Sequence, residues 1–240
     1  MDRPTAAMLV IGDEILSGRT RDSNTHYLAG QLTAHGVDLR EARVVSDDPA
    51  AIVGAVQALS AAWDVVFTSG GIGPTHDDIT ADCVAQAFGA AIDVRDDARA
   101  ILQAYYDTQG IELNAARLRM ARIPEGAELI DNPVSAAPGF RIGNVHVMAG
   151  VPKIFEAMVA SVLPSITGGA PLLSTSVRVD RGEGDIAGVL SDLVAAYPAL
   201  AFGSYPFQRD GKFGVNVVIR GTDAAQLSVA EAQLKQAFAA

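Results

Sequence analysis

The chain has 240 residues, 49% hydrophobic and 19% charged, which suits a globular protein with one large core or with a large and a small one. Its formal net charge of −10 argues against a nucleic acid or an anionic membrane surface as a partner, because both attract an excess of lysine and arginine. With one cysteine, Cys83, no intrachain disulfide can form. No apolar run approaches the roughly 20 residues of a membrane span, and the N-terminus lacks a signal-peptide pattern, so we expect a cytoplasmic protein.

The first part of the chain alternates strand and helix patterns. Three strands are expected, at residues 6–12, 37–46 and 63–71. The first is a short continuous apolar run, typical of a strand covered on both faces, and the third is interpreted as a buried strand that ends in glycines. A helical pattern follows each of them: residues 23–36, residues 47–63 and the stretch that ends near residue 89. In the second of these helices Asp48 is the expected N-cap, because Pro49 suits the first helical position. The alternation predicts an α/β protein, a three-layer sandwich with a mostly parallel sheet.

The middle of the chain has a helical pattern over residues 96–119, followed by a stretch rich in proline, glycine and asparagine. Two short strands are expected within that stretch, at residues 140–142 and 145–148. A further helix is expected after Pro152. These elements complete the predicted sandwich.

Residues 164–173 are the best linker candidate, which predicts a first domain at residues 1–165 and a second at residues 172–240. Beyond the linker the pattern changes to an alternating strand, a helix capped by Asp185, two strands around an "RDG" turn, and a closing helix over residues 224–238. We therefore expect a small C-terminal α+β domain.

The third predicted strand leads into "TSGGIGPTHDDIT", in which three glycines and a proline precede Asp77 and Asp78. Thr75 followed by Asp78 fits the pattern of a capped helix start, and capping alone would explain these two residues. The glycines, however, follow a predicted buried strand, at the end where α/β sheets bind ligands. Glycine lets backbone N–H groups approach an anion closely. We therefore interpret this stretch as a loop that binds phosphate.

Acidic residues follow all three predicted strands, and a parallel sheet brings their loops to one edge. Asp13 and Glu14 follow the first strand, and "SDD", which ends at Asp48, follows the second, although Asp48 fits better as an N-cap. Carboxylates gathered there would repel a phosphate unless a hard cation such as Mg²⁺ lies between them. The sequence therefore predicts a divalent metal site at this edge.

Several segments occur in an order known from one superfamily: "GDEILSGRTRDSNTHYLAGQL", "VVSDDPAAI", "TSGGIGPTHDDIT", "IPEGAELIDNP", "APGF" and "AGVP". On these segments the chain resembles the molybdopterin-binding (MogA/MoaB-like) domains. Within them it is most similar to the N-terminal region of the CinA family, over residues 6–165. The remaining residues resemble the small KH-like α+β domain that follows in that family.

The resemblance implies an α/β sandwich of the molybdopterin-binding type in a homo-oligomer, with a small-molecule nucleotide or pterin as partner and neither nucleic acid nor membrane. It implies a metal-dependent nucleotide pyrophosphatase that hydrolyses ADP-ribose or an FAD-like compound with Mg²⁺, Mn²⁺ or Co²⁺. Two alternatives stay open. One is molybdopterin as the ligand, with adenylyl transfer in molybdenum cofactor biosynthesis. The other is a nucleotide- or pterin-binding module without turnover.

By position, the resemblance also assigns site residues. Asp78 is the first choice as metal ligand and catalytic carboxylate, with Asp13 as a second metal ligand and both Asp77 and Asp13 as further catalytic candidates. If both neighbours were helical, Asp77 and Asp78 would point about 100° apart, and only one would face the ligand. The expected substrate- and phosphate-binding residues are Gly70, Gly71, Gly73, Pro74, Thr75, Asn24, Asp48, Gly139, Gly150 and Pro152.

The sequence departs from the family's pattern in two loops of the predicted pocket. "AGVPKIF" carries Ala149, Ile154 and Phe155 where the family has Pro, Glu and Met, and this change favours the binding-module alternative. "SAAPG" stands for "GTAPG". The sequence ends near the start of the family's amidase domain, so we expect no nicotinamide-nucleotide deamidation. A KH-type RNA grip needs a Gly-x-x-Gly loop among basic residues, whereas Gly182 and Gly184 lie among acids.

Overall fold

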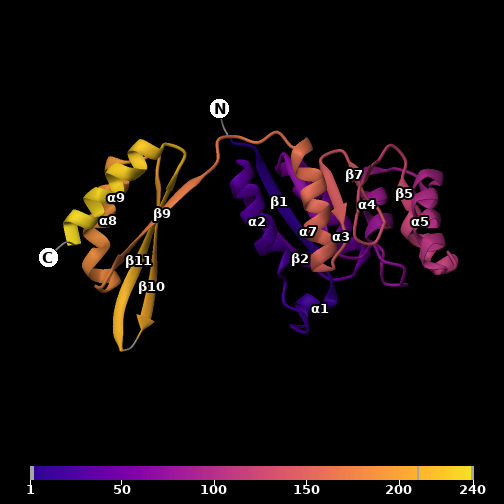
Figure 1. Ribbon diagram of the computed structural model, residues 1–240, viewed down its shortest axis with the longest axis horizontal. Coiled ribbons are helices and arrows are strands. Elements are labelled where there is room, and N and C mark those ends of the chain that lie inside the picture. Colours follow the sequence, from indigo (N-terminus) through magenta and orange to yellow (C-terminus); the bar gives the residue numbers. More distant parts are fainter. Residues whose placement is uncertain (1–2, 210, 239–240) are drawn as a thin grey trace. The chain divides into compact units, whose positions relative to one another are not determined.

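The computed structural model describes residues 3–209 and 211–238 (Figure 1). Asp210 in the predicted "RDG" turn therefore lies outside the described residues, as do the two residues at each end of the chain. The chain divides into two compact units, one ending at Gly169 and the other beginning at Ala170.

A six-stranded sheet forms the centre of the first unit, in the order β2-β1-β3-β8-β7-β6. Four neighbouring strands run parallel: β2 (Asp38–Val45), β1 (Thr5–Ile11), β3 (Val65–Ser69) and β8 (Val145–Met148). Two short strands extend the sheet in the antiparallel sense: β7 (Gly139–Ile142) and β6 (Glu128–Ile130). The predicted mostly parallel sheet is thereby confirmed, and the antiparallel edge is the part that the pattern did not indicate.

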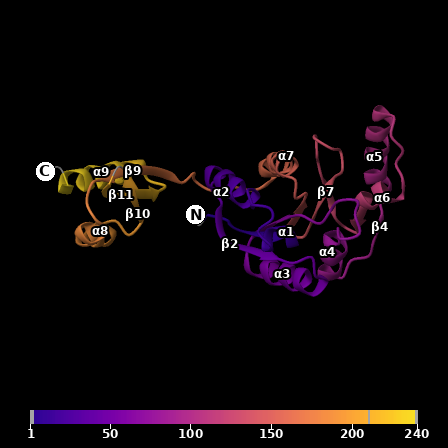
Figure 2. The same ribbon diagram turned by 90° about the horizontal axis from the view of Figure 1, so that it is seen from below.

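Helices cover both faces of this sheet, as Figure 2 shows. The helices on one face are α2 (Asn24–His35) and α7 (Pro152–Val162), and those on the other are α3 (Pro49–Ala62) and α4 (Thr80–Phe88). Successive residues of β1 alternate between the two cores, since Met8 packs with the first pair and Leu9 with the second, both fully buried. This double coverage is the reason that β1 is an unbroken apolar run in the sequence.

The predicted helix over residues 96–119 is wrong in its second half. α5 (Asp96–Gln109) ends because Gly110 takes a φ of 64°, in the left-handed region that favours glycine. The chain then forms short elements: α6 (Ala115–Leu118), η1 (Arg119–Ala121) and the antiparallel pair β4 (Ile92–Val94) and β5 (Arg122–Pro124). The remaining short helices of this unit are α1 (Asp13–Leu16) and η2 (Leu163–Ser165).

The alternative interpretation of Thr75 as a helix cap is wrong, because α4 begins only at Thr80 and has no side-chain cap. The Asp78 carboxylate instead accepts a hydrogen bond from the Thr75 N–H at 2.8 Å, which holds these residues in a turn. Asp77 and Asp78 are therefore not helical, and the 100° separation does not apply. The cap at Asp48 is confirmed, since its side chain accepts from the Ala51 N–H at 2.9 Å.

The second unit follows the predicted β-α-β-β-α order. Its elements are β9 (Leu173–Val179), α8 (Glu183–Ala196), β10 (Ala201–Arg209), β11 (Lys212–Gly221) and α9 (Ala224–Phe238). The three strands form an antiparallel sheet in the order β10-β11-β9. Asp185 is not the N-cap of α8 as predicted; Gly182 is, and the Asp185 carboxylate accepts from its N–H. In neither unit does the described chain contain a helix long and apolar enough to cross a membrane.

His146 is a buried histidine in the first unit. It lies on β8, is only 4% exposed, and its ring stacks on Phe67 with the centroids 5.3 Å apart. Burial, aided by the positive charge of Arg141, lowers the pKa of His146 to about 4. The imidazole is therefore neutral in the folded protein at neutral pH.

We expect the first unit to lose stability as the pH falls from about 6.5 to about 4. In this window the unfolded chain binds a proton at His146 and the folded chain does not, so protonation favours unfolding, by up to about 3 kcal/mol. Urea unfolding at a series of pH values measures this loss. His146→Gln should flatten this part of the profile, whereas His26→Gln, at an exposed histidine, should leave it unchanged. Equal profiles for wild type and His146→Gln would contradict the assignment.

Candidate functional site

A cleft of about 510 Å³ lies at the carboxyl ends of the parallel strands. Gly12 after β1, Asp47 after β2, Gly70 after β3 and Ala149 after β8 all line it. Parallel α/β sheets bind their ligands at this edge, and the volume is within the usual range for small-molecule sites. The loops that the sequence places at one edge therefore do meet around one cavity.

The glycine loop after β3 is shaped by contacts that only glycine permits. Gly70 and Gly71 both have left-handed φ values, 111° and 68°. A Cβ on Gly70 would overlap the Ile11 carbonyl oxygen, and a Cβ on Gly71 would overlap the Thr80 hydroxyl. Both glycines line the cleft. The loop thus presents bare backbone to the cleft, which suits the binding of an anion.

The turn that follows brings two carboxylates to the cleft. Asp77 and Asp78 both line it, as do Gly73 and Pro74. One Asp78 oxygen accepts from both the N–H and the hydroxyl of Thr75, at 2.8 and 2.5 Å. The Thr75 hydroxyl also lowers the pKa of Asp77 and thereby favours its ionised form. Thr75 therefore holds the Asp78 carboxylate in place and favours the ionised form of Asp77.

Two more carboxylates line the cleft from the loops after β1 and β2, namely Glu14 and Asp47. Asp47 accepts a hydrogen bond from the Asp13 N–H at 2.9 Å. Burial raises the pKa of Asp47, the hydrogen bond opposes this, and the negative charges of Asp13, Glu14 and Asp77 raise it further. The carboxylates thus repel one another, and a bound cation would relieve this repulsion.

Asp13 and Asp48, both expected at the site, lie next to residues that line the cleft but do not line it themselves. The side chain of Asp13 is exposed on α1, and that of Asp48 caps α3. Gly139 is likewise not among the residues that line the cleft. It packs against β8 instead, where a Cβ would overlap the Val147 carbonyl oxygen. In contrast, Gly150 and Pro152 line the cleft as expected.

Asn24 joins two of the cleft's loops from behind. This buried side chain donates to the Ser69 hydroxyl at 2.7 Å and to the Gly150 carbonyl at 2.8 Å. It lines a smaller cavity of about 50 Å³ that shares Glu14 and Gly150 with the cleft. Asn24 therefore fixes the spacing between the ends of β3 and β8.

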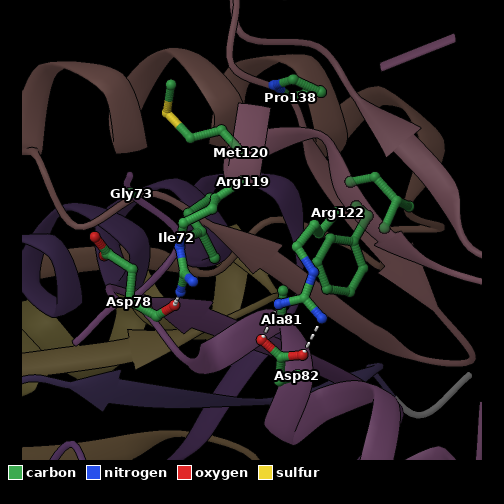
Figure 3. Close-up of a pocket in the computed structure, with 12 residues that line it drawn as sticks. Ile72, Gly73, Asp78, Ala81, Asp82, Arg119, Met120, Arg122 and Pro138 are labelled. Carbon is green, nitrogen blue, oxygen red and sulfur yellow. Dashed lines mark hydrogen bonds and ion pairs between the residues drawn. The ribbon is translucent and has the colours of Figure 1, made fainter. Parts of the chain in front are cut away.

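Two arginines that share a small cavity with the glycine loop were not predicted as site residues. Figure 3 shows Arg119 beside Asp78, and Arg122 paired with Asp82. Arg119 donates from Nη2 to the Asp78 carbonyl at 3.3 Å, and its Nε is buried without a partner. Arg122 makes two hydrogen bonds of 2.6 Å with the Asp82 carboxylate. Both partners are about 40 positions away along the chain, so no local pattern could indicate these contacts.

The described residues contain no group of three or more histidine, cysteine, aspartate or glutamate side chains close enough to hold a metal ion. Mg²⁺ is usually bound by only one or two carboxylates, with waters and substrate phosphates completing its shell. The cleft, with Glu14, Asp47, Asp77 and Asp78 along its lining, fits a cation bound in that way.

Comparisons with known proteins fall on both units. Residues 7–168 match the family model described as "Probable molybdopterin binding domain", and residues 171–240 match the one described as "FAD synthase, middle domain". The chain is 33% identical to a "Probable FAD synthase" of Caenorhabditis elegans over 263 residues, 99% of this chain and 50% of that protein. It is 40% identical to a "CinA-like protein" of Citrifermentans bemidjiense over 167 residues, 68% of this chain and 40% of that protein. The chain thus spans about half the length, or less, of these curated relatives.

One solved structure is similar in both sequence and fold. The protein CinA from Thermoplasma acidophilum, described as having unknown function, is 35% identical to this chain, with a TM-score of 0.62. The similarity covers 68% of this chain and 97% of that one.

Gly71→Ala should destabilise the first unit much more than Gly89→Ala. Both glycines have similar left-handed φ values, 68° and 64°, so each substitution carries a backbone strain of about 1–2 kcal/mol. A Cβ at position 89 meets open space, whereas one at position 71 overlaps the Thr80 hydroxyl, and this overlap adds about 1–3 kcal/mol. Urea unfolding of the two variants measures the difference, and equal losses would show that the loop accommodates a side chain.

Proposed function

Because the chain belongs to the family of molybdopterin-binding domains, we propose that its cleft hydrolyses the pyrophosphate linkage of a nucleotide with the help of a divalent cation. One observation carries the proposal. Four carboxylates line the cleft, and no lysine or arginine is among the described residues that line it. Such a surface repels a bare phosphate, yet the glycine loop beside it suits an anion. A cation between them reconciles the two features.

We assign the metal-holding role to Asp78 together with a carboxylate from the facing loops. Asp47 and Glu14 line the cleft there, and Asp13 is the candidate from the sequence. A bound Mg²⁺, Mn²⁺ or Co²⁺ would neutralise phosphate charge and lower the pKa of a coordinated water. The Thr75 hydroxyl lowers the pKa of Asp77 and favours its ionised form, so Asp77 would add negative charge beside the cation.

The glycine loop has the second role in this proposal. Backbone N–H groups of residues 71–73 would stabilise the negative charge that develops on the phosphate during hydrolysis, since the N–H groups of Gly70 and Thr75 already donate to Met148 and Asp78. Asn24 supports this role indirectly, because it fixes the end of β3 to the loop after β8. The loop's conformation is imposed by its packing against Ile11 and Thr80, so it needs little rearrangement when a ligand binds.

The substrate class that we propose is a nucleotide diphosphate compound, FAD or ADP-ribose. FAD is supported by the match of residues 171–240 to the FAD synthase middle domain and by the C. elegans relative's name. Both compounds contain an adenylyl group joined through a pyrophosphate, so hydrolysis of either releases AMP. The cleft itself does not discriminate between them by charge.

A second candidate is a binding module for a nucleotide or a pterin that has lost turnover. Ala149 and Ile154 stand where the resembling family has proline and glutamate, and both line the cleft. If that glutamate takes part in hydrolysis, Ile154 removes it from the site. Molybdopterin as the ligand, with adenylyl transfer, is a separate enzymatic alternative, although it too predicts ligand binding without hydrolysis.

The purified chain should release AMP from FAD or ADP-ribose with Mg²⁺, Mn²⁺ or Co²⁺ and not with EDTA. Asp78→Asn should lower the rate by about 100-fold or more, as expected for loss of a group that acts in the transition state. Chromatography of the products measures the release.

A matched pair of variants separates the cleft from its surroundings. Asp47→Asn removes a lining carboxylate and should lower the rate, whereas Asp48→Asn changes only the helix cap, which asparagine also provides. Asp13→Asn tests the ligand that the sequence suggests. A folded protein that binds either nucleotide or a pterin but releases no AMP would replace hydrolysis with the binding-module reading.

A further inference from the structure

The sheet of the second unit has one covered and one open face. α8 and α9 pack on the covered face, where Val177 of β9 and Val217 of β11 are buried in the small core. Side chains alternate along a strand, so the residues between them point to the other face. There Ser174, Ser176 and Arg178 of β9 are all exposed. Neither helix of this unit covers that surface, which we call the open face.

Two aromatic rings of β10 lie on the open face, each over a glycine. A Cβ on Gly203 would come within 3.0 Å of the Tyr205 ring, and a Cβ on Gly214 of β11 would come within 2.5 Å of the Phe207 ring. The glycines therefore leave the rings room to lie close to the backbone. Tyr205 remains 50% exposed. An exposed ring supported from below is a surface on which another planar ring can stack.

Positive charge lies beside both rings. The Arg178 guanidinium lies over Phe207, 4.5 Å from the ring centroid, and pairs with Asp180 at 2.8 Å. Arg220 of β11 reaches Tyr205, donating from Nη2 to the hydroxyl oxygen at 3.5 Å, a long hydrogen bond. A guanidinium held this loosely can bind a phosphate in its place.

We propose that the open face binds a nucleotide, with the base stacked on Tyr205 and the phosphate bound by Arg220. The aromatic ring and the arginine match the two parts of such a ligand. A longer nucleic acid fits less well, because the chain carries a net charge of −10. A second copy also fits less well. In a symmetric dimer the same face would meet itself, so the arginines of the two copies would come together and repel one another. Asp180 could offset this charge, but it is already paired with Arg178 of its own chain.

Photolabelling of the full chain with 8-azido-AMP tests the proposal directly. Peptide mapping should place the label in β10 (Ala201–Arg209), and unlabelled AMP should compete with it. Tyr205→Ala should weaken AMP binding about fivefold or more, the least expected from loss of one base–aromatic stack, whereas Tyr205→Phe should retain it. Phe213→Ala is the matched control. Phe213 is 66% exposed, but by strand alternation it lies on the opposite side of β11.

Arg220→Gln separates the two parts of the ligand, because it should weaken binding of AMP but not of adenosine. The proposal fails if the label lies only in the first unit, or if Tyr205→Ala and Phe213→Ala behave alike. It also fails if a single-stranded oligonucleotide binds Tyr205 far more tightly than AMP. A dimer that Tyr205→Ala dissociates, without AMP binding at this face, would assign the face to a second copy. Because the label is located by peptide, none of these outcomes depends on hydrolysis in the cleft.

Discussion

Close contact between backbones at the carboxyl end of the sheet is the constraint on which the first unit's site depends. Gly70 lies so near the end of β1 that a side chain would overlap the Ile11 carbonyl oxygen, and a Cβ on Gly150 would stand only 3.2 Å from the Cα of Gly70. Asn24 ties the loops after β3 and β8 together with two hydrogen bonds. Three strand ends thus form one assembly, so the loop's N–H groups are placed by packing and not by a ligand.

Negative and positive side chains occupy different places around this assembly. The cleft is lined by carboxylates, whereas Arg119 and Arg122 line a smaller cavity together with residues 71–73 of the glycine loop (Figure 3). Arg119 binds the backbone carbonyl of Asp78 and leaves its carboxylate to the turn and the cleft. Arg122 binds Asp82, in the first turn of α4. Positive charge therefore stabilises the loop's position without neutralising the acidic lining, and the lining keeps its attraction for a cation.

How much of this could be predicted from the sequence depends on the length scale of each feature. The long parallel strands were predictable because apolar runs are local signals, and they are confirmed. The resemblances to the molybdopterin-binding domains and to the CinA family were predictable because ordered motifs are also local signals, and they are confirmed as well. Strands of three residues, such as β4 (Ile92–Val94), carry too little alternation to be recognised. The sequence cannot distinguish the turn at Thr75 from a helix cap, since the same pattern of residues fits both.

The lining of the site was predictable only to within one residue. Each acidic loop was identified correctly as a loop at the edge, but the family resemblance assigns Asp13 and Asp48 to the site, whereas Glu14 and Asp47 line the cleft. Adjacent residues in a loop point in directions set by backbone angles that composition does not determine. The contacts of Arg119 were beyond prediction for a different reason, because they join segments about 40 positions apart.

The cleft of the first unit and the open face of the second unit offer a nucleotide different chemical groups. No aromatic side chain is among the described residues that line the cleft, and its apolar parts are aliphatic, such as Ile72 and Ile154. The cleft is therefore suited to the charged centre of a nucleotide, provided that a cation screens its carboxylates. The open face has Tyr205 for a base and Arg220 for a phosphate, and needs no cation to bind either. Removal of divalent metal should consequently abolish nucleotide binding in the cleft and leave binding at the open face intact, which separates the two sites without any mutation.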